Sequence, residues 1–137
     1  EQAARHFIDL INYSWASGDT TPLDEFTEER CTYCRVISEQ VHDVYDNGGW
    51  AHGVKYTVMQ IEGNYPVKTD SPETAGFSDC YVLALRVQRS KSDVYESLTL
   101  NRLSQKDTRL FLVIHWDGNG WSVIEGKGED ADAPQSE

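Results

Sequence analysis

The stretch VHDVYDNGGWAHGVKYTV (residues 41–58) marks the point where the periodicity of the chain changes. Before it, apolar residues recur every three to four positions, as on one face of a helix. After it, apolar and polar residues alternate, as in a half-buried strand. Asn47-Gly48-Gly49 separates the two patterns and is typical of a helix end. Helices over residues 1–47 and strands over residues 54–126 predict an α+β domain, with N-terminal helices packed on a curved antiparallel sheet.

Three helices are expected in the first part of the chain. The first ends at Ser17-Gly18-Asp19, because Gly18 suits the left-handed conformation that often closes a helix. A short second helix is expected from Thr21-Pro22, with Thr21 as its cap, to about Arg30, and a third from about Thr32 to Asp46. The apolar stripes of the first and third helices are Ala4, Phe7, Ile8, Ile11 and Trp15, and Tyr33, Ile37, Val41, Val44 and Tyr45.

The strands are expected to follow one another as an up-and-down antiparallel sheet. Five are predicted, at residues 54–62, 81–88, 94–102, 109–116 and 121–125. Gly63-Asn64 interrupts the first strand, and residues 66–76, with two Pro and several small polar residues, read as a loop. Turns are expected at Ser90–Asp93 and at Asp117–Gly120, the second of which is a strong hairpin signal.

Length and charge limit the classes of function. A chain of 137 residues suits one domain, which we place at residues 1–128, and residues 129–137 form an acidic tail that we expect to be flexible. The net charge of −11 disfavours binding to nucleic acid or to an anionic membrane surface. No stretch approaches the ~20 apolar residues of a membrane span. Because Glu1 opens almost directly on a helical pattern, we expect that a longer precursor has lost a targeting segment.

The motif Cys31-Thr-Tyr-Cys34 brings two sulfurs within one helical turn and has three interpretations: a structural disulfide, a redox-active dithiol or half of a zinc site. Zinc is disfavoured because the sequence has no second C-x-x-C and no H-x-x-x-H. A redox motif is expected after a strand of a βαβ unit, whereas this one follows a short helix. We therefore predict a local disulfide and no metal. Cys80 is expected to be a buried thiol on a strand, although its pairing with Cys31 or Cys34 stays open.

The segments Phe7–Tyr13, Ser17–Leu23, Cys31–Cys34 and Gly48–Trp50, together with Gly53, form a combined pattern that is more specific than any one piece. Together they resemble a family of actinobacterial cell-envelope lipoproteins with no assigned function. The resemblance implies a lipoprotein signal peptide, a lipidated cysteine and a Ser/Pro/Thr-rich linker outside these residues. It therefore implies an extracytoplasmic protein that is anchored to the cell membrane by lipid.

The order of helix, short helix, helix and sheet, with Ala16-Ser-Gly-Asp-Thr20 after the first helix, resembles the nuclear-transport-factor-2-like cone, a cystatin-like fold. Ketosteroid isomerases and polyketide-cyclase-like enzymes share this fold. The isomerase chemistry needs a base carboxylate and an oxyanion hole made by a tyrosine and a protonated acid. Here Ile11 holds the expected tyrosine position, and His115 is the only plausible titrating group on the fourth predicted strand. The fold resemblance alone implies no activity.

Aromatic residues are candidates for the mouth of a cavity inside the cone. The alternative is that they fill the core of a strongly curved sheet, and we prefer it for Trp15, which lies on a buried helix stripe. A lone His on a strand, such as His115, is more often a hydrogen-bonded core or rim residue than a base. The candidate pocket residues are Trp15, Tyr45, Trp50, Tyr56, His115 and Trp116.

Three function hypotheses follow. The first is a non-catalytic extracytoplasmic binding or interaction module of a lipoprotein, which needs no cofactor and takes an unknown protein partner or a small apolar ligand. The second is a small cone-fold enzyme, isomerase- or cyclase-like, that acts on an apolar ligand through His115 or a pocket tyrosine. The third is a thiol-redox protein acting through Cys31 and Cys34. The open face of the sheet also leaves a homodimer as an option.

Overall fold

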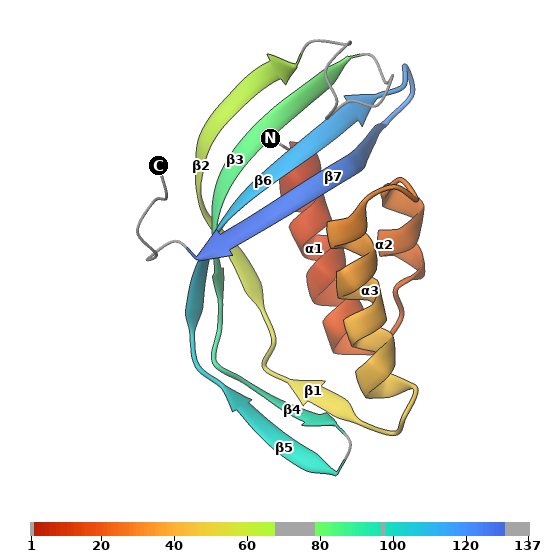
Figure 1. The fold of residues 1–137 in the computed structure, drawn as a ribbon, viewed down its shortest axis with the longest axis vertical. Helices are drawn as coiled ribbons and strands as arrows, with labels where there is room; N and C mark the ends of the chain where they lie inside the picture. Colours follow the sequence, from red (N-terminus) through yellow and green to blue (C-terminus); the bar gives the residue numbers. More distant parts are fainter. Residues whose placement is uncertain (1, 68–78, 97, 131–137) are drawn as a thin grey trace.

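A computed structural model describes residues 2–67, 79–96 and 98–130, and in these residues three helices precede seven strands (Figure 1). The helices are α1 (Gln2–Ser17), α2 (Thr21–Phe26) and α3 (Thr32–Tyr45). The strands are β1 (Trp50–His52), β2 (Tyr56–Val67), β3 (Cys80–Arg89), β4 (Ser92–Glu96), β5 (Thr99–Leu103), β6 (Lys106–Trp116) and β7 (Trp121–Asp130). The predicted α+β class, with N-terminal helices on a curved antiparallel sheet, is confirmed.

The strands form two antiparallel sheets that share one long bent hairpin. The larger sheet has the order β2-β3-β6-β7 and the smaller has the order β1-β4-β5. One arm of this hairpin consists of β3 and β4, which are separated by Ser90-Lys91, and the other consists of β5 and β6, which are separated by Ser104-Gln105. Each arm therefore runs from one sheet into the other. Figure 1 shows the smaller sheet at the far end of this bend, below the ends of α1 and α3.

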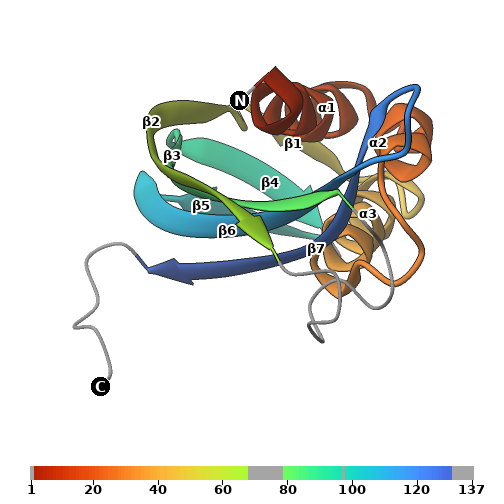
Figure 2. The same ribbon diagram turned by 90° about the horizontal axis from the view of Figure 1, so that it is seen from above.

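The helices cover one face of the larger sheet, which we call the inner face (Figure 2). Along β3 this face carries Leu83, Leu85, Val87 and Arg89, because side chains alternate along a strand. The opposite, outer face has a small buried cluster of its own, made of Cys80, Val113 and Ile124. The main core therefore lies between the helices and the inner face; its largest fully buried side chains include Phe7, Leu23, Leu83, Leu85, Leu110 and Leu112.

The first and third helices begin and end close to their predicted limits, and the end of α1 shows why glycine is required there. Gly18 has a φ of +78°, and its N–H donates to the Ser14 carbonyl at 2.8 Å. A Cβ at this position would lie 2.9 Å from Tyr45 Cγ. Any larger residue would therefore be strained and would also collide with the side chain that packs α3 against α1.

The second helix differs from its prediction at both ends. Its cap position is Thr20 rather than Thr21, and the Thr21 N–H donates to Asp19 Oδ1 at 3.0 Å. The helix stops at Phe26 instead of near Arg30 because Thr27 turns to an extended conformation and forms a parallel bridge with Val123. The helix therefore ends four residues earlier than predicted, where the chain makes its contact with the sheet.

The strand prediction was wrong in the smaller sheet. The predicted single strand over residues 94–102 is two strands, β4 and β5, joined by a turn in which Leu98 has a φ of +65°. The predicted turn at Ser90–Asp93 is shorter, because β4 already begins at Ser92. The short strand β1, which pairs with β4, was not predicted.

Two strands of the larger sheet also run further than predicted. β2 continues through Gly63-Asn64 to Val67, and the residues that we expected to interrupt it produce register shifts instead. β7 extends to Asp130, so Glu129 and Asp130 belong to the sheet and not to the predicted tail. The remaining predicted tail, residues 131–137, and most of the predicted loop, residues 68–76, lie outside the described residues.

The predicted disulfide is present. Cys31 and Cys34 are bonded, and both are buried under the start of α3. Cys31 also caps this helix, since its sulfur accepts the Cys34 N–H at 3.2 Å. Cys80 is buried on the outer face, away from this pair, so its pairing with either of them is excluded.

Candidate functional site

The helices do not fill the inner face completely, and a groove remains between them and the bent sheet. It consists of two hollows, of about 210 Å³ and about 350 Å³, which share Gln40, Tyr56 and Arg89. We call the two together the inner groove. Apolar residues of the smaller hollow include Ile8, Ile11, Ile37, Val87 and Leu110; those of the larger are Trp15, Val44, Val54, Val94 and Leu103.

Polar residues cross the centre of the groove in one row. Tyr56 of β2 pairs with Arg89 of β3, and Arg89 pairs in turn with Lys106 of β6. The Arg89 guanidinium donates through Nη2 to the Ser104 carbonyl at 3.0 Å. Its Nε is buried and has no hydrogen-bond partner within the described parts of the chain. The row therefore brings two cations into the groove, one of them with an unused donor.

The tyrosines of the groove are neutral at physiological pH. Burial raises the pKa of Tyr33 to about 12, and the nearby Tyr56 contributes further to this rise. Burial also raises the pKa of Tyr56, although the positive charge of Arg89 acts in the opposite direction. Neither phenol can therefore supply a negative charge to balance Arg89.

The structure brings together only part of the predicted pocket. Trp15 and Tyr56 line the larger hollow, and Tyr45 supports it because its hydroxyl donates to the Trp15 carbonyl. Trp50 instead lies on β1, 45% exposed, with its ring stacked on Tyr95 at 5.8 Å. The burial prediction for Trp15 is confirmed, since it is 9% exposed on the inner side of α1.

The other two predicted pocket residues lie near the opposite end of β6. His115 pairs with Cys80, and both lie on the outer face. Trp116 is near the hairpin turn, where its ring lies 5.1 Å from that of Trp121. Neither residue lines the inner groove.

Of the central residues of the groove, Tyr56 was among the predicted pocket residues, whereas Gln40, Arg89 and Lys106 were not. Arg89 has the same parity along β3 as Leu83, Leu85 and Val87, so strand alternation already places it on the buried face. The predicted strand ended at residue 88, however, and so did not include Arg89. Gln40 and Lys106 gave no comparable signal, because both are exposed and hydrophilic.

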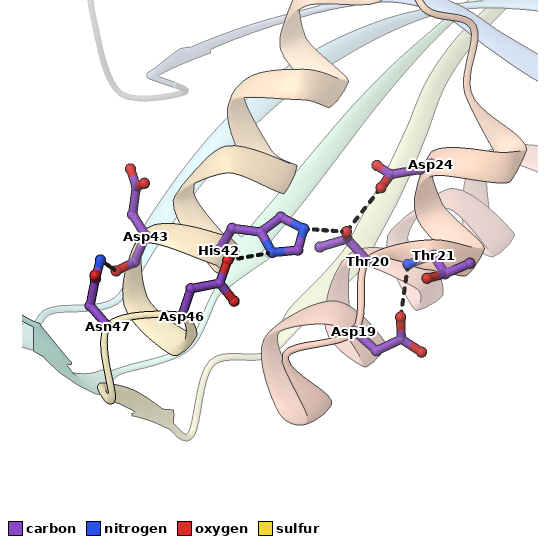
Figure 3. Close-up of polar contacts among 8 residues, drawn as sticks. All are labelled: Asp19, Thr20, Thr21, Asp24, His42, Asp43, Asp46 and Asn47. Atoms are coloured by element: carbon purple, nitrogen blue, oxygen red, sulfur yellow. Dashed lines mark hydrogen bonds and ion pairs between the residues drawn. The ribbon is translucent and has the colours of Figure 1, made fainter.

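A second polar cluster joins α2 to α3 (Figure 3). Thr20 Oγ1 lies 2.8 Å from His42 Nε2, and His42 Nδ1 lies 3.2 Å from Asp46 Oδ2. The order hydroxyl, imidazole and carboxylate is that of a hydrolase triad. Thr20, however, is only 3% exposed, and its hydroxyl donates to Asp24 Oδ2 at 2.9 Å. The hydroxyl proton is thus already used, and the cluster acts as a tie between two helices.

Other classes of site find little support in the described residues. No group of three or more His, Cys, Asp or Glu in that part of the chain is placed to hold a metal ion. Both sulfurs of the disulfide are buried, which weighs against a role in thiol exchange. Within residues 2–67, 79–96 and 98–130, no helix has the length and apolar character needed to cross a membrane.

Two solved structures have a similar fold. The intermembrane space region of the chloroplast protein ARC6 superposes with a TM-score of 0.67 at 9% identity, over 96% of this chain and 94% of that chain. An uncharacterized protein with a cystatin-like fold from Caulobacter vibrioides superposes with a TM-score of 0.57 at 10% identity, over 96% of this chain and 89% of that chain. At such identities the likeness shows the fold alone, and it confirms the predicted cystatin-like class.

The sequence comparison gives the family without giving an activity. No curated protein matches the chain. Residues 1–127, which include all three helices and most of β7, match a family model described as a family of unknown function. The chain therefore belongs to the family DUF6318.

Proposed function

We propose that this protein is a non-catalytic binding module that holds a small apolar ligand in the inner groove. The observation that carries the proposal is the groove itself, whose walls are mainly aliphatic and aromatic and whose centre is a short polar row. Ligand sites commonly have this composition, with few polar groups that orient a mostly apolar molecule. The larger hollow, about 350 Å³, is within the usual size of such sites.

The groove offers little for proton transfer. Its titratable residues are Tyr33, Tyr56, Arg89, Glu96 and Lys106. A tyrosine whose pKa is raised by burial, as for Tyr33 and Tyr56, is a poor base, and an arginine does not release its proton in proteins. His115, the residue named in the enzyme hypothesis, lies on the other face of the sheet.

One observation favours the second candidate function, a cone-fold enzyme. Glu96 and Tyr56 line the same hollow, and a carboxylate with a tyrosine hydroxyl is the pair that proton abstraction next to a carbonyl would use. Glu96 lies at the last position of β4, close to the hairpin turn, whereas Tyr56 lies on the central row. An enzyme would therefore need a substrate that reaches from one end of the hollow to the other.

The proposed location is outside the cytoplasm, on a lipid anchor. A buried disulfide supports it, because disulfides persist mainly in oxidising compartments. The ARC6 region that shares the fold belongs to an intermembrane space. The lipid anchor itself is supported only by the resemblance of the sequence to envelope lipoproteins.

The binding function can be tested with the neutral fluorescent dye Nile red. Gln40 is exposed and lies where the two hollows meet, so Gln40→Trp should obstruct the groove without removing core contacts. The matched control is Glu39→Trp, which adds the same ring at the next exposed position of α3, outside the groove lining. We expect saturable binding by the wild type and by the control.

We expect Gln40→Trp to weaken dye binding at least about tenfold, which corresponds to ~1.4 kcal/mol. Circular dichroism of both variants checks that α3 is retained. Absence of saturable binding to the wild type, or equal weakening by the two tryptophans, would contradict the proposal.

A further inference from the structure

The charged residues at the centre of the inner face are positive, whereas the chain as a whole is negative. The protein has a net charge of −11, yet Arg89 and Lys106 lie directly opposite each other on β3 and β6. Like charges at paired positions of neighbouring strands destabilise a sheet. Over the described residues, no carboxylate lies within ion-pair distance of either side chain. The smaller hollow is lined by these two cations and by no acid.

The outer face of the same strands shows how the chain treats a comparable pair. Arg86 and Arg109 are also paired across β3 and β6, three residues along each strand from Arg89 and Lys106. There Arg109 Nε lies 3.4 Å from Glu62 Oε1, and its Nη1 lies 3.7 Å from Glu129 Oε1. Carboxylates from β2 and β7 thus offset the positive charge of the outer pair. Among the described residues, the inner pair of Arg89 and Lys106 has no such carboxylate.

Arg89 also has an unfilled hydrogen-bonding position. The buried Nε has no partner within the described residues, and the guanidinium's acceptors there, the Ser104 carbonyl and the Tyr56 hydroxyl, are both neutral. A buried donor without an acceptor is unfavourable, and the more so when it carries charge. Tyr56, its neighbour in the row, is uncharged. What is missing beside Arg89 is an oxygen with negative charge.

We propose, on the basis of the binding function above, that the ligand is an amphipathic carboxylic acid whose carboxylate binds between Arg89 and Lys106. Tyr56 and Gln40 border the head group, and the hydrocarbon body occupies the larger hollow against Trp15, Val54 and Leu103. A guanidinium suits a carboxylate because its fork of N–H groups matches two oxygens. Glu96 at the other end of the hollow repels a second anionic end and so fixes the direction of the ligand.

Three probes separate the parts of this proposal: decanoate has head and tail, decanol has the tail alone, and acetate has the head alone. Binding is measured by calorimetry at about 0.15 M salt, where the remote negative charges of the protein are largely screened. We expect decanoate to bind at least about tenfold more tightly than decanol, the factor given by hydrogen bonds to a charged group. Acetate at the same concentration should not compete.

The variant Arg89→Met keeps most of the side-chain volume and removes the charge. We expect it to bind decanoate no more tightly than decanol. The matched control is Arg86→Met, on the same strand but on the outer face, which should keep the tenfold preference. Lys106→Gln changes an exposed position and tests the proposal should Arg89→Met fail to fold. It should reduce the preference for decanoate over decanol about two- to fivefold, because it removes one partly solvated charge.

The outcomes distinguish this proposal from the binding function. Equal affinity of the wild type for decanoate and decanol, with Nile red still bound, would overturn the carboxylate assignment. The proposed binding function of the inner groove would remain valid. Competition by acetate would show an adventitious anion site and would also overturn it. Failure of Nile red and both ten-carbon probes to bind would instead refute the binding function itself.

Discussion

The two ends of the inner face differ in what they carry and what covers them. In the larger sheet, β3 and β6 place Leu83, Leu85 and Leu112 under the helices, and these side chains are fully buried. Beyond the bend, the arms carry smaller or polar residues such as Val94 and Asn101, and the larger hollow opens there. The bend alone therefore does not make a cavity. The hollow arises because the sheet turns toward the helices while its side chains become too small to fill the space.

The largest expected effect separates the filled end from the hollow end. Leu83→Ala removes a fully buried side chain and should lower the free energy of unfolding by about 2–5 kcal/mol. Leu103→Ala, on the partly exposed wall of the hollow, should cost less than about 1.5 kcal/mol but weaken binding of Nile red. Urea unfolding measures the first quantity and dye titration the second. Equal destabilisation by the two variants would show that the hollow is in fact filled.

An intermediate effect tests the Thr20–His42 contact that holds α2 against α3. Thr20→Val keeps the shape of the buried side chain but removes the hydroxyl that joins Asp24 and His42. We expect a loss of about 1–3 kcal/mol in unfolding free energy, because polar groups are left without their partner. Asp46→Ala is the control, since Asp46 is well exposed and its ion pair with His42 is worth at most about 1 kcal/mol. A Thr20→Val protein as stable as wild type would remove the structural role of this cluster.

The smallest effect at neutral pH concerns Tyr33, which packs against Gly126 and Gly128 of β7. Its pKa is raised from 10.0 to about 12 by burial, so the folded state holds the phenolic proton more tightly than the unfolded state does. The resulting contribution is complete below pH 10 and is lost as the pH rises from 10 through 12. Denaturant titrations at pH 9 and pH 11.5 should therefore show a fall in stability.

In Tyr33→Phe that fall should be smaller, because phenylalanine has no proton to lose. Tyr13→Phe is the control, since Tyr13 is exposed on α1. A fall of the same size in wild type and Tyr33→Phe would mean that other groups cause the alkaline loss of stability.

Sequence periodicity predicted the helical part of the fold well because packing and propensity agree there. Phe7, Ile8 and Ile11 repeat at helical spacing and are all buried, so the pattern and the core coincide. The Cys31–Cys34 pair was predicted for a local reason, the distance that a helical turn imposes. Such features depend on neighbours in sequence, and a single chain is enough to reveal them.

The bent hairpin could not be predicted in the same way. The turn between β4 and β5 has no Gly, Asn or Pro, and Leu98 takes the left-handed conformation that such residues usually supply. The alternation of apolar and polar residues continues through the turn, so the sequence pattern predicts one strand where the structure has two. The groove depends on how far α3 stands from the sheet after the bend, which is a long-range property that no local pattern contains.

The irregularities of β2 have a consequence for contacts between molecules. β2 forms one edge of the larger sheet, and an uninterrupted edge of twelve residues would be a ready template for another chain to join by strand addition. Two register shifts break its ladder, and Pro66 near its end has no N–H to donate. These irregularities therefore make the β2 border a poorer template for strand addition than a regular twelve-residue edge would be.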